Sequence, residues 1–116
     1  MAPKPSAGSL RHRVAFDARS ASDDGYGNTV AGDFAEKFQC RADLRSRGGS
    51  EAVLAARLEG RNIFGVYVRS SSQTRQITTD WRMRDARLGT VYAIDAVDSV
   101  TDPAWVYLTV ESGVAA

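Results

Sequence analysis

The sequence predicts a mainly β protein: a small β-barrel or sandwich of about six strands with one short α-helix at about residues 51–59. Short segments in which apolar and polar residues alternate recur along the chain, and turn sequences separate them. Only residues 47–60 have the spacing and the end signals of a helix instead. For 116 residues one domain is expected, at residues 9–112, between a flexible lead-in (1–8) and a flexible tail (113–116).

Composition is that of an ordinary globular domain, with 43% hydrophobic and 25% charged residues. No apolar run approaches the ~20 residues that a membrane span requires, and the first eight residues lack the apolar core of a secretory signal. We therefore expect no membrane association and a chain that stays in the cytosol. The single cysteine, Cys40, lies at an inward strand position, which favours a small buried hydrophobe over a reactive thiol.

The first strand is expected over residues 10–17, where apolar and polar residues alternate strictly. His12, the only histidine, shares the apolar side and is interpreted as a core or rim residue, because no catalytic partner is spaced around it. Residues 20–30 follow and contain two turn pairs, Asp24-Gly25 and Gly27-Asn28. They predict a hairpin tip or a longer loop, and they lack the EF-hand spacing of a calcium site.

The next strand, at residues 34–45, is the clearest in the chain. Its inward positions are apolar except for Glu36, which breaks the alternation near the start of the strand. The apolar positions are Phe34, Phe38, Cys40, Ala42 and Leu44.

The helix follows, with Ser50 as N-cap and Gly60 as the residue that ends it. Leu54 and Leu58 are four residues apart, so they form one narrow apolar stripe. Because so short a helix is not stable alone in water, we expect this stripe to pack on the sheet.

Further strands are expected at residues 62–69, at 77–84, through Tyr92 and Ile94, and at 105–111. Gly65, in the middle of its strand, predicts a bulge or bend. In the last strand the alternation points Val106, Leu108 and Val110 inward and Trp105, Tyr107 and Thr109 outward. The polar segment at residues 70–76 is interpreted as a solvent loop.

No catalytic triad, zinc-protease motif, paired-cysteine motif or phosphate loop is present in the sequence. We therefore expect no enzyme, no catalytic residue, no metal and no cofactor. Charge is unevenly distributed: six basic and two acidic residues lie at 61–87, whereas four acidic and no basic residues lie from 95 to the end. This separation suits a head-to-tail ring, although an ordinary mixed, solvated surface gives the same counts.

The order of these motifs resembles the head-tail joining proteins of long-tailed phages, in particular the head-closure or stopper family. The resemblance covers nearly the full chain. Its motifs are G-S-L-R-H-R-V-A-F (8–16), D-G-Y-G-N (24–28), the strand 38–44 with G-G-S-E-A-V-L-A-A-R-L-E-G (48–60), V-Y-V-R (66–69), the Trp81 strand, G-T-V-Y-A-I (89–94) and L-T-V-E-S-G-V-A-A (108–116). The chain departs from the usual pattern in having Cys40 where Trp is common and a Ser-rich rather than acidic loop in the 70s.

The resemblance implies a small β-barrel with one helix that assembles as a ring, of six or twelve copies with six favoured, in a phage, prophage or gene transfer agent particle built in the bacterial cytoplasm. Such a ring sits below the portal and adaptor and above the tail terminator or tail tube. It continues the DNA channel, retains packaged double-stranded DNA without reading its sequence, and offers a docking surface to the tail. The alternatives are an adaptor or tail-terminator ring subunit and, more distantly, an OB-like nucleic-acid-binding barrel.

Two sets of residues are candidate contacts on this interpretation, and ordinary solvent loops are the alternative for both. The candidate lumen or partner loop is Ser70, Ser71, Ser72, Gln73, Thr74, Arg75 and Gln76. The candidate inter-subunit or adaptor contacts are Asp24, Tyr26, Asn28, Arg45, Arg47 and Arg57, with the 20–32 loop as a whole.

Overall fold

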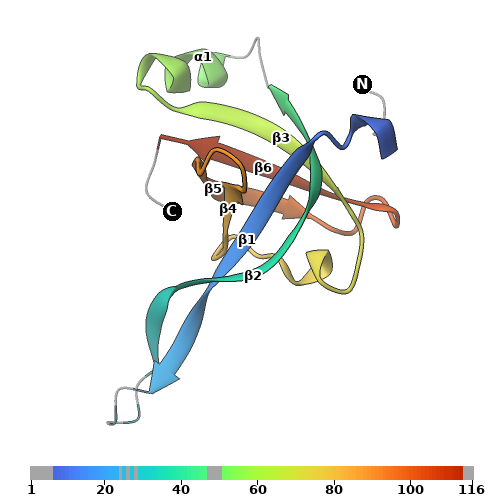
Figure 1. Ribbon diagram of the computed structural model, residues 1–116. Coiled ribbons are helices and arrows are strands. Elements are labelled where there is room, and N and C mark those ends of the chain that lie inside the picture. The colour runs from blue at the N-terminus through green and yellow to red at the C-terminus, as the bar shows by residue number, and fades with distance from the viewer. Residues whose placement is uncertain (1–6, 24, 26, 28, 47–50, 114–116) are drawn as a thin grey trace.

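The computed structural model describes residues 7–23, 25, 27, 29–46 and 51–113, and over these residues the predicted class is confirmed. Six antiparallel strands form a closed barrel, accompanied by one α-helix (Figure 1). In chain order the elements are η1 (Ala7–Ser9), β1 (His12–Asp23), β2 (Thr29–Ser46), α1 (Glu51–Leu58), β3 (Asn62–Arg69), η2 (Thr74–Gln76), β4 (Arg82–Asp85), β5 (Val91–Asp98) and β6 (Trp105–Ser112). Around the barrel the order is β1-β2-β3-β6-β5-β4, and β4 closes it by pairing with β1.

The hydrophobic core fills the inside of the barrel. Alternation along β6 is as predicted, since Val106, Leu108 and Val110 are fully buried. Phe16 of β1 is the largest fully buried side chain, and its ring lies 5.3 Å from that of Phe38 on β2. The core cluster is Val14, Phe16, Ala42, Val66, Val68, Ile77, Met83, Tyr92, Ile94, Val106, Leu108 and Val110.

The β1–β2 hairpin is much longer than the sequence predicts and projects from the barrel (Figure 1). β1 pairs with β4 only at residues 14–17, and β2 pairs with β3 only at residues 42–46. Beyond these positions the two strands pair only with each other, and we call residues 18–23 and 29–35 the hairpin arm. The expected loop at 20–30 is therefore wrong in extent: β1 continues to Asp23 and β2 begins at Thr29.

A β-bulge explains the break in the pattern of β2. Phe16 pairs with Phe38 and Asp17 pairs with Glu36, so Lys37 is an extra residue between the two pairs. An extra residue changes the face to which the preceding residues point. Glu36 consequently lies on the outer face beside Asp17.

Gly65 does not mark a bulge, because its pairing with both neighbouring strands is regular. Its role is instead to leave room for the Tyr107 ring. A Cβ at this position would overlap the phenol oxygen of Tyr107 and come within 3.0 Å of two of its ring carbons. Tyr107 also packs against Tyr67, with 4.8 Å between ring centroids, so the absence of a side chain at Gly65 makes this outer wall compact.

Replacing Gly65 by Ala is expected to destabilise the protein by about 1–3 kcal/mol, because the methyl group must displace the Tyr107 ring. Urea unfolding of the variant measures this effect. In the Tyr107→Ala background the same change is expected to cost much less, since the overlapping ring is gone. Equal costs in the two backgrounds would contradict the explanation.

The prediction that α1 packs its leucines on the sheet is wrong. Leu58 is 90% exposed and Leu54 is 49% exposed. After its C-terminal end the helix continues into β3 through Gly60. The backbone of Gly60 packs closely against Gly113, which follows β6. Its apolar stripe is thus not covered by the barrel.

Three smaller expectations also change. The strand expected over 77–84 begins only at Arg82, although Ile77 is buried in the core. Trp105 points outward as predicted but is buried, because the Arg69 guanidinium lies over its ring at 5.3 Å. His12 is exposed rather than part of the core.

Candidate functional site

The segment at residues 70–76 follows β3 and includes η2, and it is a folded loop rather than a featureless one. Thr74 is buried, and its Oγ1 donates to the Arg69 carbonyl oxygen at 2.7 Å. The backbone N–H of Ser71 donates to Thr74 Oγ1, and the N–H of Thr74 donates to Ser71 Oγ. Arg75 Nε donates to Ser70 Oγ at 2.8 Å. Ser72, Gln73, Arg75 and Gln76 are exposed, so the loop presents a polar outer side from a fixed backbone.

A cavity of about 300 Å³ lies beside this loop. Its walls combine apolar side chains of the barrel with the polar loop, and two arginines stand at its edge. The lining residues are Leu10, Phe38, Cys40, Arg41, Arg69, Ser71, Gln73 and Thr74. Burial raises the pKa of the Cys40 thiol to about 11, so this group is neutral at neutral pH. Cys40 packs against the core as an apolar residue but is partly rather than fully buried.

Asp24, Tyr26 and Asn28 lie outside the described residues, whereas the strands of the hairpin arm, 18–23 and 29–35, are described. The base of the arm carries a network that sequence reasoning missed. Asp17 is 2% exposed and receives hydrogen bonds from Arg82 Nε at 2.8 Å and from Arg84 Nη2 at 3.1 Å.

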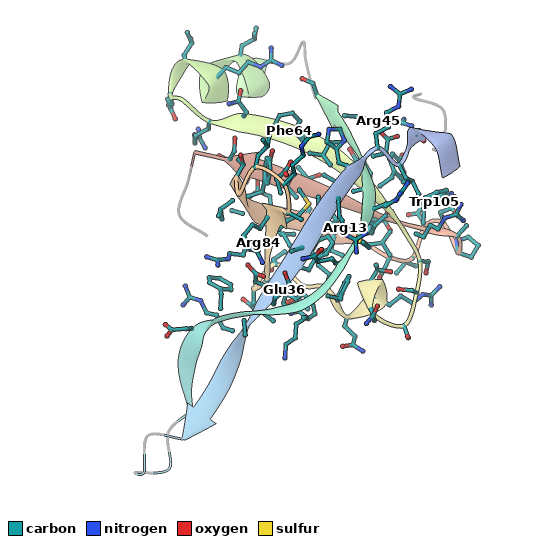
Figure 2. All side chains as sticks on the ribbon, viewed as in Figure 1. Arg13, Glu36, Arg45, Phe64, Arg84 and Trp105 are labelled. Atoms are coloured by element: carbon teal, nitrogen blue, oxygen red, sulfur yellow. The ribbon has the colours of Figure 1, made fainter. Side chains whose placement is uncertain are left out.

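Arg84 also links the two strands of the hairpin to β4. Its Nη2 donates to Glu36 Oε1 at 3.0 Å, and Figure 2 shows Arg84 and Glu36 at the position where the hairpin leaves the barrel. Gln39 donates to the same Glu36 oxygen at 3.1 Å, and Arg13 Nε donates to Gln39 Oε1 at 3.0 Å. The hydrogen bonds from Gln39 and Arg84 lower the pKa of the Glu36 carboxyl. The network therefore links both strands of the hairpin to β4 at the position where the arm begins.

Phe34 completes this base. The guanidinium groups of Arg82 and Arg19 lie 4.4 and 4.6 Å from the centre of its ring. Such cation–π contacts fix an aromatic side chain on an exposed strand without a hydrophobic core beneath it. The arm is thus supported at its base by cation–π contacts and ion pairs with side chains of β4.

Arg45 and Arg57 have separate side-chain partners in the described residues, while Arg47 lies outside them. Arg57 Nη2 donates to Ser46 Oγ at 3.0 Å, and Ser46 follows Arg45 in β2. Arg45 Nε bonds to Asp43 Oδ2 at 3.0 Å, and its guanidinium lies 5.0 Å from the centre of the Tyr67 ring.

Arg45 belongs to an outer wall of aromatic and arginine side chains that sequence reasoning did not identify. Tyr67 pairs with Tyr107, and Arg69 pairs with Trp105, across β3 and β6. Arg45 and Trp105 lie well away from the Glu36–Arg84 pair in Figure 2. Tyr, Trp and Arg are the residue types enriched in protein interfaces, so this wall is a second surface suited to binding.

A carboxyl pair lies at the bulge of β5. Ile94 pairs with Val110 and Ala96 with Thr109, so Asp95 is the extra residue and turns toward Glu111. Glu111 is 8% exposed and accepts a hydrogen bond from Arg61 Nη1 at 2.7 Å. Desolvation, the hydrogen bond with Glu111 and the charge of Glu111 raise the pKa of Asp95 to about 6, against the opposing effect of Arg61.

Because the pKa of Asp95 is raised on folding, ionisation of this group costs stability as pH rises from about 4 to 6. Asp95→Asn is therefore expected to stabilise the protein at pH 7 and to have a smaller effect at pH 4. The side chain is exposed, so solvent screening limits the gain to about 1 kcal/mol. Urea unfolding at both pH values measures this, and a larger gain at pH 4 would contradict it.

The described part of the chain contains no group of three or more His, Cys, Asp and Glu side chains that could hold a metal ion. It likewise contains no helix with the length and hydropathy of a membrane span. The main surface features of the described residues are the hairpin arm, the loop beside the cavity, the aromatic wall and the exposed face of α1.

Comparison with known proteins agrees with this architecture. The chain superimposes on protein SF1141 from Shigella flexneri 2a with a TM-score of 0.67 and 14% identity, covering 95% of this chain and 98% of that one. A chain from the virion of a native gene transfer agent particle matches with a TM-score of 0.60 and 17% identity, covering 91% and 96%. At these identities the two structures establish the fold. No curated protein sequence matches the chain significantly.

The model of one protein family, described as phage head completion protein, matches residues 5–113. The match spans all six strands, the helix and the hairpin arm. This chain therefore belongs to the phage head completion protein family, whose members are structural proteins of phage particles.

Proposed function

We propose that this protein is the stopper subunit of a head-tail connector. In this proposal, copies of the chain form a ring, of six or twelve subunits with six favoured, below the portal and its adaptor. The ring continues the DNA channel, retains packaged double-stranded DNA and offers the surface on which the tail terminator or tail tube docks. The observation that carries the proposal is the family match over residues 5–113, supported by the fold shared with a chain of a gene transfer agent virion.

The hairpin arm supports a role in assembly. A two-stranded ribbon has marginal stability in water, and both of its edges offer unpaired backbone groups. An arm of this kind extends the molecule to 50 Å along its longest axis, and the Asp17 network anchors its base. We propose that the arm, together with Asp24, Tyr26 and Asn28 of the sequence between its two strands, contacts the adaptor or a neighbouring subunit.

The other candidate residues have places in the same scheme. The exposed side chains of residues 70–76 are proposed to face the lumen or a partner, because their backbone is fixed while their outer side is polar. Arg45, Arg57 and Arg47 are proposed as inter-subunit contacts. The formal net charge of +1 suits a channel that holds DNA without tight binding.

An adaptor or tail-terminator ring is the second candidate position. Adaptors of the resembled type tend to be helical, and in the described residues the only α-helix has eight residues, which favours the stopper. An OB-like nucleic-acid-binding barrel predicts salt-sensitive binding of single strands by the isolated protein.

A deletion with complementation tests the proposal. Removing the gene from a producing strain is expected to yield DNA-filled heads and separate complete tails, with the packaged DNA sensitive to added nuclease. Expression of the chain in trans is expected to restore tailed particles. Normal tailed particles from the deletion strain, or a block before DNA packaging, would contradict the stopper assignment.

A further inference from the structure

Two uncovered surfaces lie at opposite ends of β3. One is the leucine face of α1, which we define as Leu54 and Leu58; these residues are four apart on one side of the helix and are 49% and 90% exposed. The other is the cavity of about 300 Å³ beside residues 70–76. The helix ends just before Asn62, where β3 begins, and the cavity includes Arg69, where β3 ends.

The cavity is suited to an aliphatic side chain. Leu10, Phe38 and the neutral thiol of Cys40 form its apolar part, and its volume is roughly ten times that of one water molecule in the liquid. When an apolar side chain enters such a pocket, the apolar surfaces of both the side chain and the pocket are removed from water, which is favourable. The cavity is therefore complementary in chemistry to an exposed leucine.

Charge is complementary as well. Glu59 follows Leu58 directly, and its side chain is 64% exposed although it pairs with Arg61. The C-terminal end of a helix also carries partial negative charge. Arg41 and Arg69 stand at the cavity and are both exposed, so a helix end that enters the cavity would bring its negative groups to two guanidinium groups.

We propose that the leucine face of one copy docks on the next copy of the chain, with Leu58 seated in the cavity lined by Phe38 and Cys40. This inference rests on the proposed ring and names the contact that builds it. The eight residues of β3 separate the two surfaces by roughly 23 Å, so one molecule cannot bring them together. Because the two surfaces differ, the contact is head-to-tail and repeats from copy to copy, as a closed ring requires.

Cys40, the only cysteine in the sequence, makes this contact directly testable. In a Leu58→Cys variant of the full chain, the new thiol of one copy would lie beside Cys40 of the next. Purified variant is added to filled, tailless heads that lack the chain, oxidised with copper phenanthroline at pH 8.5, and analysed by non-reducing electrophoresis. The matched control is Val100→Cys, because Val100 is equally exposed (89%) but is not among the residues that line the cavity.

The expected result is a ladder of cross-linked oligomers from the Leu58→Cys variant, with ~tenfold or more product than the control because the two thiols are held together. Adding Cys40→Ser to Leu58→Cys is expected to abolish the ladder. Three results would overturn the contact: no ladder above the control, a ladder that persists after Cys40→Ser, or cross-linking of position 58 to a different protein.

Sedimentation of the same samples separates this inference from the proposed function. Protein that binds the heads and completes them without forming the ladder overturns the contact alone. Protein that forms the ladder but neither binds heads nor retains DNA supports the contact and overturns the stopper assignment. Circular dichroism of each variant confirms folding. Leu58 and Val100 are exposed, so little loss of stability is expected from substitution there, and Cys40→Ser exchanges one atom of a partly buried side chain.

Discussion

Asp17→Asn is expected to reduce the free energy of unfolding by about 2–3 kcal/mol at pH 7. This loss is smaller than that for a fully buried ion pair, because the two arginine partners of Asp17 are partly exposed to solvent. Asp17 is 2% exposed, whereas the side chains of Arg82 and Arg84 are 29% and 28% exposed. Losing the carboxylate leaves both guanidinium groups without their shared partner at the base of the arm. Urea unfolding at constant m-value measures the loss.

The effect should depend on pH in a defined direction. Burial alone would raise the pKa of the Asp17 carboxyl, but hydrogen bonds from Arg84 and Arg82, together with their charges, lower it below its ordinary value of 3.8. A lowered pKa contributes stability that is present above the unfolded value and is lost as pH falls through the folded one. The difference between wild type and Asp17→Asn should therefore shrink below about pH 4.

Asp80→Asn is the matched control, since Asp80 is an exposed aspartate in the turn before β4. Its substitution is expected to change stability by less than ~0.5 kcal/mol. A similarly small effect for Asp17→Asn, or a loss that grows at low pH, would contradict the role assigned to the network.

Shortening the hairpin arm is expected to abolish head completion while leaving the barrel folded. Replacing residues 22–30 by Asn-Gly joins Ala21 to Ala31, which already pair across the hairpin, through a turn that suits two-residue hairpins. The core cluster of the described residues is formed by other parts of the chain. If the arm contains the adaptor or neighbour contact, loss of several interface residues should lower the yield of tailed particles by at least ~100-fold.

The control for the shortened arm is the full-length chain in which Asp33, an exposed arm residue, is replaced by Asn. Particle yield from complementation and urea unfolding should be measured for both. Wild-type yield from the shortened chain would show that the arm is dispensable. A large loss of stability would show that it supports the barrel instead.

Much of the barrel could be predicted from the sequence because strands with one buried face have a period of two. Val106, Leu108 and Val110 lie where the alternation places them. The arm was missed because a ribbon with no core beneath it leaves no apolar alternation, and its Ser and Asp residues are also common in turns. The bulges at Lys37 and Asp95 were missed because an extra residue changes the face only through pairing with a distant strand.

The binding surfaces were harder to predict because they depend on contacts between distant parts of the chain. Asp17 and its partner Arg82 are 65 residues apart, so its burial cannot be seen in the local pattern. The leucines of α1 were recognised as an apolar stripe, but periodicity does not reveal whether the same chain or another molecule covers such a stripe.

The most direct test of the central proposal is to add the purified chain back to filled, tailless heads from a strain that lacks it. Binding is measured by co-sedimentation, DNA retention by nuclease protection, and joining by adding purified tails. The proposal predicts that the chain binds the heads, protects their DNA and restores tailed particles. Heads that bind no protein, or that lose DNA and stay tailless although the protein is bound, would contradict it.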